Sequence, residues 1–396
     1  MSRLHAISKI RSLLRSRGSA RISHTSMSFC WLKTGETGLI EMLAAIQAAK
    51  ESVRLEMYII QPGEPGESFR NALVAAVKRG VRVQVLADAL GSVSLPKNFW
   101  LPMTAAGGEF RYFNLPGLDR MGLRDHRKLM VCDDHRVFIG GINIGPEYAG
   151  DGVNKGWRDL GLHFHGTLAR ELSAAFDEMF AIAEFKHSRF AWLRHAIRQR
   201  RIEANEVTVL LGAPGWRHNH MIRSLVRDFK KAQDIRIICA YFLPTIRVLH
   251  ALRRAARRGA RVQLILAAHS DIPLMRLASH GLYRRLLKDG VEIYEYQPQV
   301  LHAKLIIVNH DTVYAGSANL DVRSLVLNYE LLLRIENHGF AKEAEEIFEG
   351  DLAHCKRIEF EEWSKGRHWW HRFLGRIAYF CLATLDPYVA SRSWRR

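Results

Sequence analysis

One helix–strand unit occurs twice in the sequence, and this duplication limits the fold more than any other feature. Residues 73–92 read LVAAVKRGVRVQVLADALGS, and residues 252–271 read LRRAARRGARVQLILAAHSD, at a constant offset of 179. Each copy predicts an amphipathic helix that ends at a basic residue and a glycine, followed by a buried strand. We therefore expect two similar domains that form an internal pseudo-dimer, with any shared site on its pseudo-two-fold axis.

The rest of the chain is typical of the α/β class. Helices alternate with apolar strands throughout, which predicts mixed β-sheets flanked by helices, in duplicate. A chain of 396 residues is too long for one core and suits two domains of roughly 200 residues each. The basic, helix-prone stretch 186–206 is the expected connector. We expect a basic amphipathic N-terminal segment (1–27), a first domain (28–200), a second domain (201–355) and a basic, aromatic C-terminal segment (356–396).

Charge and cysteine content bound the partners and the compartment. The 58 Lys and Arg residues against 40 Asp and Glu give a net charge of +18, which favours a polyanionic partner, either nucleic acid or an anionic membrane. Five cysteines without a CxxC pair argue against disulfides and structural zinc, and fit a reducing compartment. With no bilayer-length apolar run and no signal peptide, we expect a cytosolic protein that can lie on a membrane.

A second duplicated pattern carries the chemistry. In both copies a histidine is followed after two positions by lysine, after 14 by a glycine and after 17 by asparagine. A lone His-x-Lys carries no signal, but four residue types at one spacing, twice, inside an independent repeat are a strong one. The first copy has His126, Lys128, Asp133, Gly140 and Asn143, and the second has His302, Lys304, Asn309, Gly316 and Asn319.

These residue types suit transfer of a group from a phosphodiester. A neutral imidazole attacks the anionic phosphorus centre well and forms a phosphohistidine, while a second, protonated histidine gives its proton to the departing alcohol. Lysines hold the non-bridging oxygens as point charges, and neutral donors add hydrogen bonds. Because the protein supplies the cations, we expect no metal and no cofactor. The expected phosphate-binding residues are Lys128, Lys304, Asn143, Asn319 and Ser317.

Both histidines need a fixed tautomer, which a carboxylate on the other ring nitrogen usually sets. Asp159 lies 33 residues after His126, and Glu330 lies 28 residues after His302. Each precedes an apolar, strand-like run, and we predict that they are the orienting acids. His163 and His165 share one face of a strand, but without a further ligand at suitable spacing we interpret them as structural rather than metal-binding.

At these motifs the sequence resembles the phospholipase D superfamily. The stretches WRDLGLHFHG at 157–166, AYFLPTIRVLHALRRAARRG at 240–259 and GSANLDVRSLVLNYE at 316–330 are similar to bacterial cardiolipin synthases, in particular to the shorter B-type without N-terminal transmembrane helices. The resemblance covers roughly residues 28–385. It implies two tandem phospholipase-D-like domains and a phosphatidyltransferase that makes cardiolipin through a phosphatidyl-histidine.

The same resemblance implies the lipids and the order of the histidines. Phosphatidylglycerol would accept the phosphatidyl group, and phosphatidylglycerol, phosphatidylethanolamine or cardiolipin would bind at an anionic membrane surface. His126 would be the nucleophile and His302 the acid and base. The implied catalytic set is His126, Lys128, Asp133, His302, Lys304, Asn309, Asp159 and Glu330.

One position departs from the family pattern, which has aspartate where this chain has Asn309. Asp133 keeps the aspartate in the first half. Asparagine accepts a hydrogen bond through its oxygen but carries no charge. If that aspartate is a structural partner, the site is intact; if its charge tunes Lys304 or a histidine, the second half is impaired.

Two terminal segments are typical of membrane contact. Residues 1–23 hold six basic residues, no acidic residue and an apolar stripe at helical spacing, as in an interfacial helix. A disordered basic tail is the alternative interpretation. Near the C-terminus, Trp363, Trp369 and Trp370 stand among cations before IAYFCLATL, which suits the headgroup boundary, with a packed core helix as the alternative. We expect a peripheral protein on the cytoplasmic face of the bacterial inner membrane.

Three other functions stay open at this point. A phospholipase D would pass the same phosphatidyl group to water. A nucleic-acid phosphodiesterase would also suit the charge, but no basic-aromatic stacking motif lies near the histidines, which argues against nucleic acid. A non-catalytic protein that binds anionic lipid would follow if Asn309 marks a degenerate second half-site.

Overall fold

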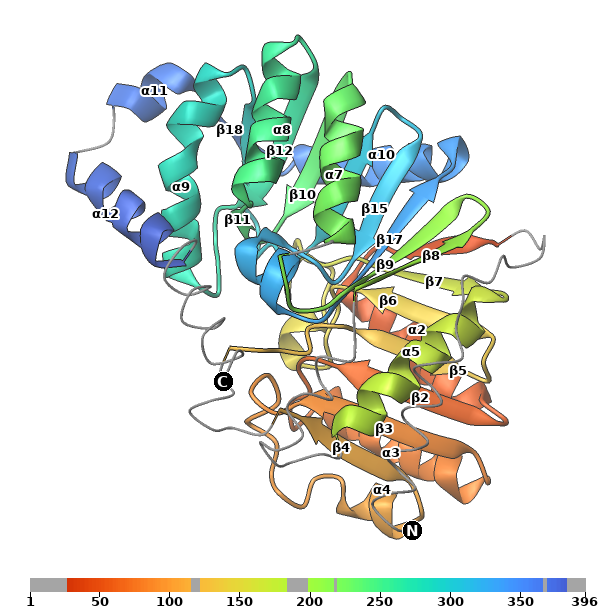
Figure 1. The fold of residues 1–396 in the computed structure, drawn as a ribbon. Coiled ribbons are helices and arrows are strands. Elements are labelled where there is room, and N and C mark those ends of the chain that lie inside the picture. The colour runs from red at the N-terminus through yellow and green to blue at the C-terminus, as the bar shows by residue number, and fades with distance from the viewer. Residues whose placement is uncertain (1–26, 115–121, 184–198, 217–218, 366–368, 383–396) are drawn as a thin grey trace.

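The computed structural model describes residues 27–114, 122–183, 199–216, 219–365 and 369–382. It consists of two α/β domains, one above the other in Figure 1, each built on a mixed sheet with helices on both faces. The predicted fold class and the duplication are confirmed. The predicted helix in residues 1–23, most of the connector at 186–206 and the side chains of Trp369 and Trp370 lie outside the described residues.

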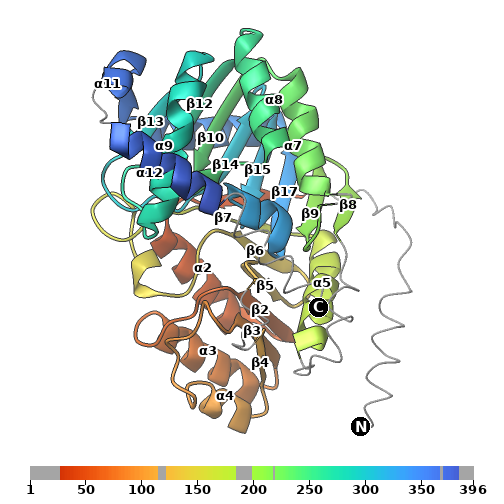
Figure 2. The same cartoon turned by 60° about the vertical axis from the view of Figure 1, so that its left-hand side comes forward.

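The first domain holds a seven-stranded sheet of order β1-β7-β6-β5-β2-β3-β4 within the described residues. Strands β2, β3 and β4 are parallel, and the other pairs are antiparallel. Figure 2 shows α2 and α3 on one face of this sheet and α5 on the other. The elements are β1 (Phe29–Leu32), α2 (Gly35–Ala48), β2 (Ser52–Met57), α3 (Gly66–Lys78), β3 (Arg82–Asp88), α4 (Leu101–Ala105), β4 (Glu109–Phe113), β5 (Leu129–Cys132), β6 (Arg136–Gly140), η1 (Pro146–Tyr148), β7 (Gly161–His165) and α5 (Leu168–Ala183).

The second domain holds a nine-stranded sheet of order β18-β13-β12-β10-β14-β15-β17-β9-β8 within the described residues. Its elements are β8 (Arg200–Ala204), β9 (Val207–Gly212), α7 (His220–Lys231), β10 (Asp234–Cys239), β11 (Phe242–Leu243), α8 (Ile246–Arg257), β12 (Arg261–Ala267), α9 (Pro273–Lys288), β13 (Glu292–Tyr296), β14 (Lys304–Val308), β15 (Thr312–Gly316), β16 (Leu320–Asp321), η3 (Arg323–Leu327), β17 (Glu330–Glu336), α10 (His338–Leu352), β18 (Cys355–Ile358), α11 (Phe360–Lys365) and α12 (Trp369–Phe380).

The two sheets repeat one strand order. The run β7-β6-β5-β2-β3-β4 of the first sheet corresponds to β17-β15-β14-β10-β12-β13 of the second. The duplicated stretches fold into α3 with β3 and into α8 with β12, and both strands are buried after their first residue. The central strand of each sheet is β5 or β14. Each of these strands begins at, or directly after, the lysine of a His-x-Lys motif.

The hydrophobic core joins the two domains. One cluster combines side chains of β5, β6 and α5 from the first domain with side chains of β14, β15 and α10 from the second. Trp31 of β1 stacks on Phe340 of α10, with ring centroids 4.7 Å apart and planes at 5°. Two further clusters fill the outer layers, one under α2 and α3 and one under α7, α8 and α9. The domains are thus fixed against each other by packing, which a shared site requires.

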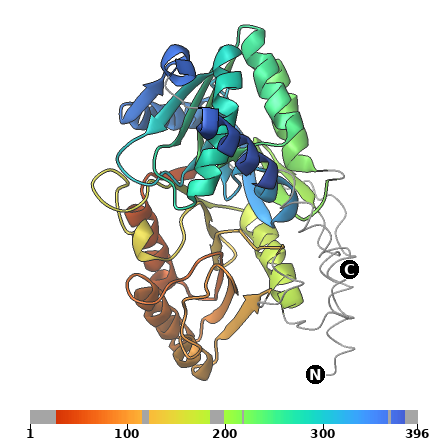
Figure 3. The ribbon, with the colours of Figure 1, turned by 90° about the vertical axis from the view of Figure 1, so that its left-hand side faces the viewer.

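Helix α12 packs on the second domain. Figure 3 shows α12 lying across α9, where Ala378 is buried. Leu374, Ile377 and Phe380 face outward, with 47%, 43% and 53% of their surface exposed. The helix therefore has one packed face and one exposed apolar face. None of the helices in the described ranges combines the length and apolar composition that crossing a bilayer requires.

A buried ion pair connects the domains next to the motifs. Arg158, just before β7, donates through Nε to Asp351 Oδ1 of α10 at 2.7 Å, and both residues are buried. Breaking such a pair costs about 3–5 kcal/mol, because one charge stays buried without a partner. An exposed pair such as Lys155 with Glu36 contributes only about 0–1 kcal/mol.

Replacing Arg158 should therefore destabilise the protein far more than replacing Lys155. We expect Arg158→Ala to lower the free energy of unfolding by about 3 kcal/mol or more and Lys155→Ala by less than about 1 kcal/mol, both measured by urea unfolding at pH 8. Burial raises the pKa of Asp351 even beside Arg158, so without Arg158 its carboxyl takes up a proton readily and the loss should be smaller at about pH 5. Equal losses for both variants would contradict the structural role of Arg158.

Candidate active site

Each histidine motif is paired by its backbone to the opposite domain. The segment 124–126 pairs with Tyr329 through hydrogen bonds of 2.9 and 3.0 Å, and the segment 300–302 pairs with Arg158 through bonds of 2.9 and 2.8 Å. Both pairings are isolated parallel bridges between the two sheets. They place the residue that follows Tyr329 beside the first histidine and the residue that follows Arg158 beside the second.

Those two residues are the predicted orienting acids, and they act across the domain boundary. His126 Nδ1 lies 3.0 Å from Glu330 Oε1, and His302 Nδ1 lies 2.5 Å from Asp159 Oδ2. Both carboxylates are completely buried. A carboxylate on Nδ1 fixes the tautomer in which Nε2 is the free nitrogen. The sequence predicted both acids, but only the structure shows that each acid contacts the histidine of the other domain.

The two carboxylates are held in different ways. Ser317 Oγ donates to Glu330 Oε2 at 2.5 Å. At the equivalent position of the first half stands Gly141, where a Cβ atom would come within 2.1 Å of Asp159 Oδ1. Asp159 instead accepts a bond from the Leu160 N–H at 2.8 Å. Ser317, predicted to bind phosphate, therefore holds the orienting acid of His126.

The two lysines lie under the histidines, buried in the site. Lys128 Nζ donates to the His126 carbonyl at 2.8 Å, and Lys304 Nζ donates to the His302 carbonyl and lies 3.3 Å from His302 Nε2. The charge of Lys304 acts on His126, and the charge of Lys128 acts on His302. The four predicted residues of the two motifs therefore share one site. Tyr58, whose ring centroid lies 4.8 Å from that of His126, covers the first half.

Burial shifts every base of the site toward its neutral form. It lowers the pKa of His126 to about 4 and that of Lys128 to about 7, and it also lowers the pKa of His302 and of Lys304. Burial alone would raise the pKa of Asp159, but His302 and Lys304 hold it below its usual range. At neutral pH the site thus combines neutral imidazoles with an ionised acid, as nucleophilic attack by histidine requires.

The two asparagines are not equivalent. Asn143 uses both ends of its amide, since Oδ1 accepts from the Ile59 N–H at 3.0 Å and Nδ2 donates to the Tyr148 hydroxyl at 2.7 Å. Asn319 is buried, and its Oδ1 has no hydrogen-bond partner among the described residues. Asn143 therefore positions Tyr148, whose ring lies 5.4 Å from His302, and Asn319 keeps more capacity for a ligand.

Three aromatic side chains around His302 were missed by the sequence reasoning. The ring centroids of Tyr148, Trp157 and Tyr241 lie 5.4, 5.6 and 6.5 Å from that of His302. Trp157 stands two residues before Asp159, which could have drawn attention to it. Tyr148 and Tyr241 come from different domains, and no spacing in the sequence connects them.

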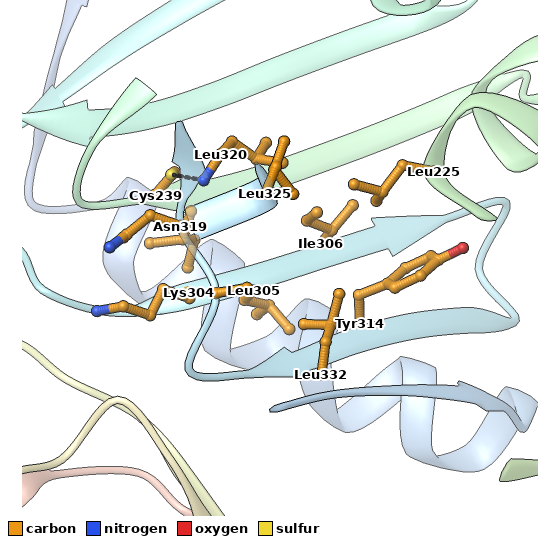
Figure 4. A pocket seen from close by; sticks show the side chains of 12 residues that line it. Leu225, Cys239, Lys304, Leu305, Ile306, Tyr314, Asn319, Leu320, Leu325 and Leu332 are labelled. Carbon is orange, nitrogen blue, oxygen red and sulfur yellow. Dashed lines mark hydrogen bonds between the residues drawn. The ribbon is translucent and has the colours of Figure 1, made fainter. Parts of the chain in front are cut away.

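The interior gaps beside the lysines belong to the core. Figure 4 shows such a gap behind Lys304 and Asn319, lined by apolar side chains that include Leu225 and Ile306. A similar gap lies behind Lys128 in the first domain. Because their linings are almost wholly apolar, neither gap suits a phosphate group.

The comparisons with known proteins agree with this geometry. The family described as cardiolipin synthase, PLD-like domain matches residues 42–179 and 225–352. Cardiolipin synthase B of Escherichia coli K12 is 32% identical over 364 residues, which cover 89% of this chain and 86% of that protein. Cardiolipin synthase 1 of Bacillus cereus is 31% identical over 84% of this chain and 68% of its own length.

The chain belongs to this family. It is an enzyme of the phospholipase D superfamily, and the relatives support phospholipid phosphatidyltransferase activity. The crystal structure of phosphatidylserine synthase from Haemophilus influenzae Rd KW20 has the same fold, with a TM-score of 0.73 and 16% identity over 96% of this chain and 98% of that one.

The position at which this family member departs from the pattern lies far from the histidines. Asp133 accepts hydrogen bonds from the backbone N–H groups of Glu51 and Ser52 at 2.8 and 2.9 Å, and Asn309 accepts from that of Gln233 at 2.8 Å. Each lies five residues beyond its lysine, about 16 Å along a strand. Their assignment to the catalytic set is therefore corrected, because both residues fasten a turn at the opposite end of β5 or β14.

Asparagine suits this turn. Asn309 has φ +54° and Asp133 has φ +55°, in the left-handed region that asparagine and aspartate adopt more readily than most residues. One amide oxygen accepts the bonds that the turn offers, so no negative charge is required. The contacts of Asn309 therefore give no structural reason for a degraded second half-site.

Restoring the aspartate should change little. We expect Asn309→Asp to keep phosphatidyl transfer within about twofold of the natural protein, because the side chain does not touch the site. Asn309→Ala should lower the free energy of unfolding by about 1–3 kcal/mol through loss of the bonds to the turn. Rate assays and thermal unfolding check both. A tenfold gain in turnover for Asn309→Asp would mean that the missing charge impairs the site.

Proposed function

We propose that the protein makes cardiolipin by transferring a phosphatidyl group from one phospholipid to a hydroxyl of phosphatidylglycerol. The observation that carries the proposal is the pair of cross-domain contacts, His126 with Glu330 and His302 with Asp159, around two buried lysines. Two oriented imidazoles in one site suit a double displacement, in which one attacks and the other moves the proton. The similarity to cardiolipin synthases supports cardiolipin as the product.

In the first step, Nε2 of His126 attacks the phosphorus of the donor lipid. The bond between phosphorus and the headgroup oxygen breaks, and its electron pair stays on that oxygen. His302, which takes up a proton from solvent when the anionic donor binds, supplies the proton that neutralises it. A phosphatidyl-histidine remains on His126. Lys128 and Lys304 hold the non-bridging oxygens, where negative charge persists through the transition state.

In the second step, His302 takes the proton of the acceptor hydroxyl while that oxygen attacks the phosphatidyl-histidine. The phosphorus–nitrogen bond breaks, and both histidines return to their starting states. The 2.5 Å contact of His302 with Asp159 supports His302 as the proton carrier, because a buried carboxylate stabilises the imidazolium that forms. The lysines supply the positive charge at the phosphate, so we propose a reaction that needs no added metal.

We further propose that the protein works as a peripheral protein at the cytoplasmic face of the inner membrane. The net charge of +18 and the exposed apolar face of α12, with Leu374, Ile377 and Phe380, support binding to an anionic lipid surface. In this proposal residues 28–200 and 201–355 form the catalytic domains, and the segments 1–27 and 356–396 contact the membrane.

The proposal is tested by incubating the purified protein in mixed micelles of phosphatidylglycerol and phosphatidylethanolamine with EDTA, followed by mass spectrometry. Cardiolipin should form with the natural protein and with His250→Ala, which removes an exposed histidine on α8, but not with His126→Ala or His302→Ala. Omitting each lipid in turn names the donor.

Other products would support one of the alternative functions. Phosphatidic acid without cardiolipin would mean a phospholipase D. Cleavage of oligonucleotides that depends on His126 would restore the nucleic-acid function. A folded protein that floats with anionic liposomes and forms no product would be a lipid-binding protein.

The pKa of Lys128 generates a pH prediction. Because burial lowers it to about 7, Lys128 loses its charge in the free enzyme as the pH rises through 7, and it then holds the phosphate less strongly. We expect kcat/KM for the donor lipid to fall above pH 7 with an apparent pKa of about 7. Lys128→Arg stays charged and should move this fall to higher pH. Identical alkaline limbs for the two proteins would rule out Lys128 as the titrating group.

A further inference from the structure

The two half-sites differ in the side chains that the segments after β2 and β10 place beside the histidines. In the first half Tyr58 lies against His126. In the second half the corresponding strand β10 is followed by Tyr241, whose hydroxyl lies 2.7 and 2.6 Å from the two carboxylate oxygens of Asp271. The ring of Tyr241 lies 6.5 Å from that of His302. A phenol and a carboxylate thus form a pair beside one histidine.

Asp271 lies at the edge of the site and is accessible. It is exposed, in the loop between β12 and α9, and its charge still acts on Lys304 and on Tyr148. In the repeat its counterpart is Ser92, which is buried and bonds to the backbone of the loop after β2. At this matched position the carboxylate therefore occurs in the second half only; the carboxylate of the first half, Asp88, is buried and accepts from the Asp125 N–H at 3.0 Å.

A role in phosphate binding does not account for the carboxylate of Asp271 at this place. An exposed negative charge beside an anion site weakens the binding of an anion. A carboxylate is an acceptor of hydrogen bonds, and a neutral hydroxyl group suits it without charge repulsion. The next exposed side chains, Ile272 and Leu274, are apolar. A polar acceptor followed by an apolar edge matches an amphiphile that carries hydroxyl groups on its head.

We propose that Tyr241 and Asp271 form the acceptor subsite and recognise the second hydroxyl of a vicinal diol, as at the glycerol end of phosphatidylglycerol. Asp271 accepts the bond from the hydroxyl that does not react, and the neighbouring hydroxyl then points to His302, which removes its proton. This inference rests on the proposed function, in which His302 activates the acceptor. It adds the residues that select this acceptor and the hydroxyl that they recognise.

Competition between two small alcohols tests the subsite. The full-length protein is given phosphatidylglycerol micelles with equal concentrations of 1,2-propanediol and 1-propanol, which differ by one hydroxyl, and the two phosphatidyl alcohols are quantified by mass spectrometry. The natural protein should favour the diol by about tenfold, the size expected for one hydrogen bond to a charged group. Both products form in one tube, so their ratio does not depend on the folded fraction.

Three variants connect the preference to the pair. Asp271→Ala should bring the product ratio close to one, Asp271→Asn should keep part of the preference, and Tyr241→Phe should reduce it because Asp271 loses its partner. Glu343→Gln removes an exposed carboxylate on α10 and should keep the natural ratio. An unchanged ratio in Asp271→Ala overturns the inference, as does a natural protein without preference for the diol.

Failure of the subsite and failure of the proposed function give different results. A natural protein that forms no His126-dependent product overturns the transferase proposal, and the subsite with it. A protein that transfers to both alcohols but ignores the second hydroxyl overturns the subsite alone. An effect of Asp271→Ala on the choice between phosphatidylethanolamine and phosphatidylglycerol as donor, with the alcohol ratio unchanged, would place Asp271 at the leaving headgroup and also overturn the inference.

Discussion

The bond between each histidine and a carboxylate of the other domain is the contact on which the site depends. Glu330 and Asp159 are completely buried, and a buried carboxylate is costly unless it is paired. Their partners, His126 and His302, come from the opposite domains. Each acid also accepts a bond within its own domain, from Ser317 or from the Leu160 N–H, but each histidine receives its carboxylate from the other domain. The shared core between the sheets is therefore a requirement of the chemistry as well as of stability.

The crossed pairing also gives the two half-sites of a duplicated fold different surroundings. The backbone bridges at Tyr329 and Arg158 are equivalent, so the two histidines occupy equivalent positions in the two halves of the protein. The acids then differ: Glu330 is longer and bound by Ser317, whereas Asp159 is shorter and needs the space left by Gly141. Small changes at matched positions thus give each histidine its own surroundings without altering the sheets.

The features that depend on residue spacing within one stretch of the chain could be predicted from the sequence. The repeat predicted the α/β fold, the matched motifs predicted the histidines and the lysines, and the apolar runs after Asp159 and Glu330 predicted the two acids. Which acid serves which histidine could not be predicted, because that contact forms between segments far apart in the chain. Asp133 and Asn309 were misplaced because motif membership was taken as proximity, although five residues of strand already separate each from its lysine. The aromatic side chains around His302 come from loops of both domains, for which no periodicity exists.

The charges of the site favour a protonated His302 only after an anionic substrate binds. In the free enzyme the buried carboxylates Asp159 and Glu330 face two lysines, and burial together with those lysines keeps the pKa of His302 low. A phosphodiester adds one negative charge to this buried region. That charge favours protonated bases nearby, so it stabilises the ammonium of Lys128 and the imidazolium of His302. In the proposed reaction, binding of the anion thus favours uptake of a proton from solvent by His302, which then gives it to the leaving headgroup, while His126, with its pKa of about 4, remains neutral enough to attack.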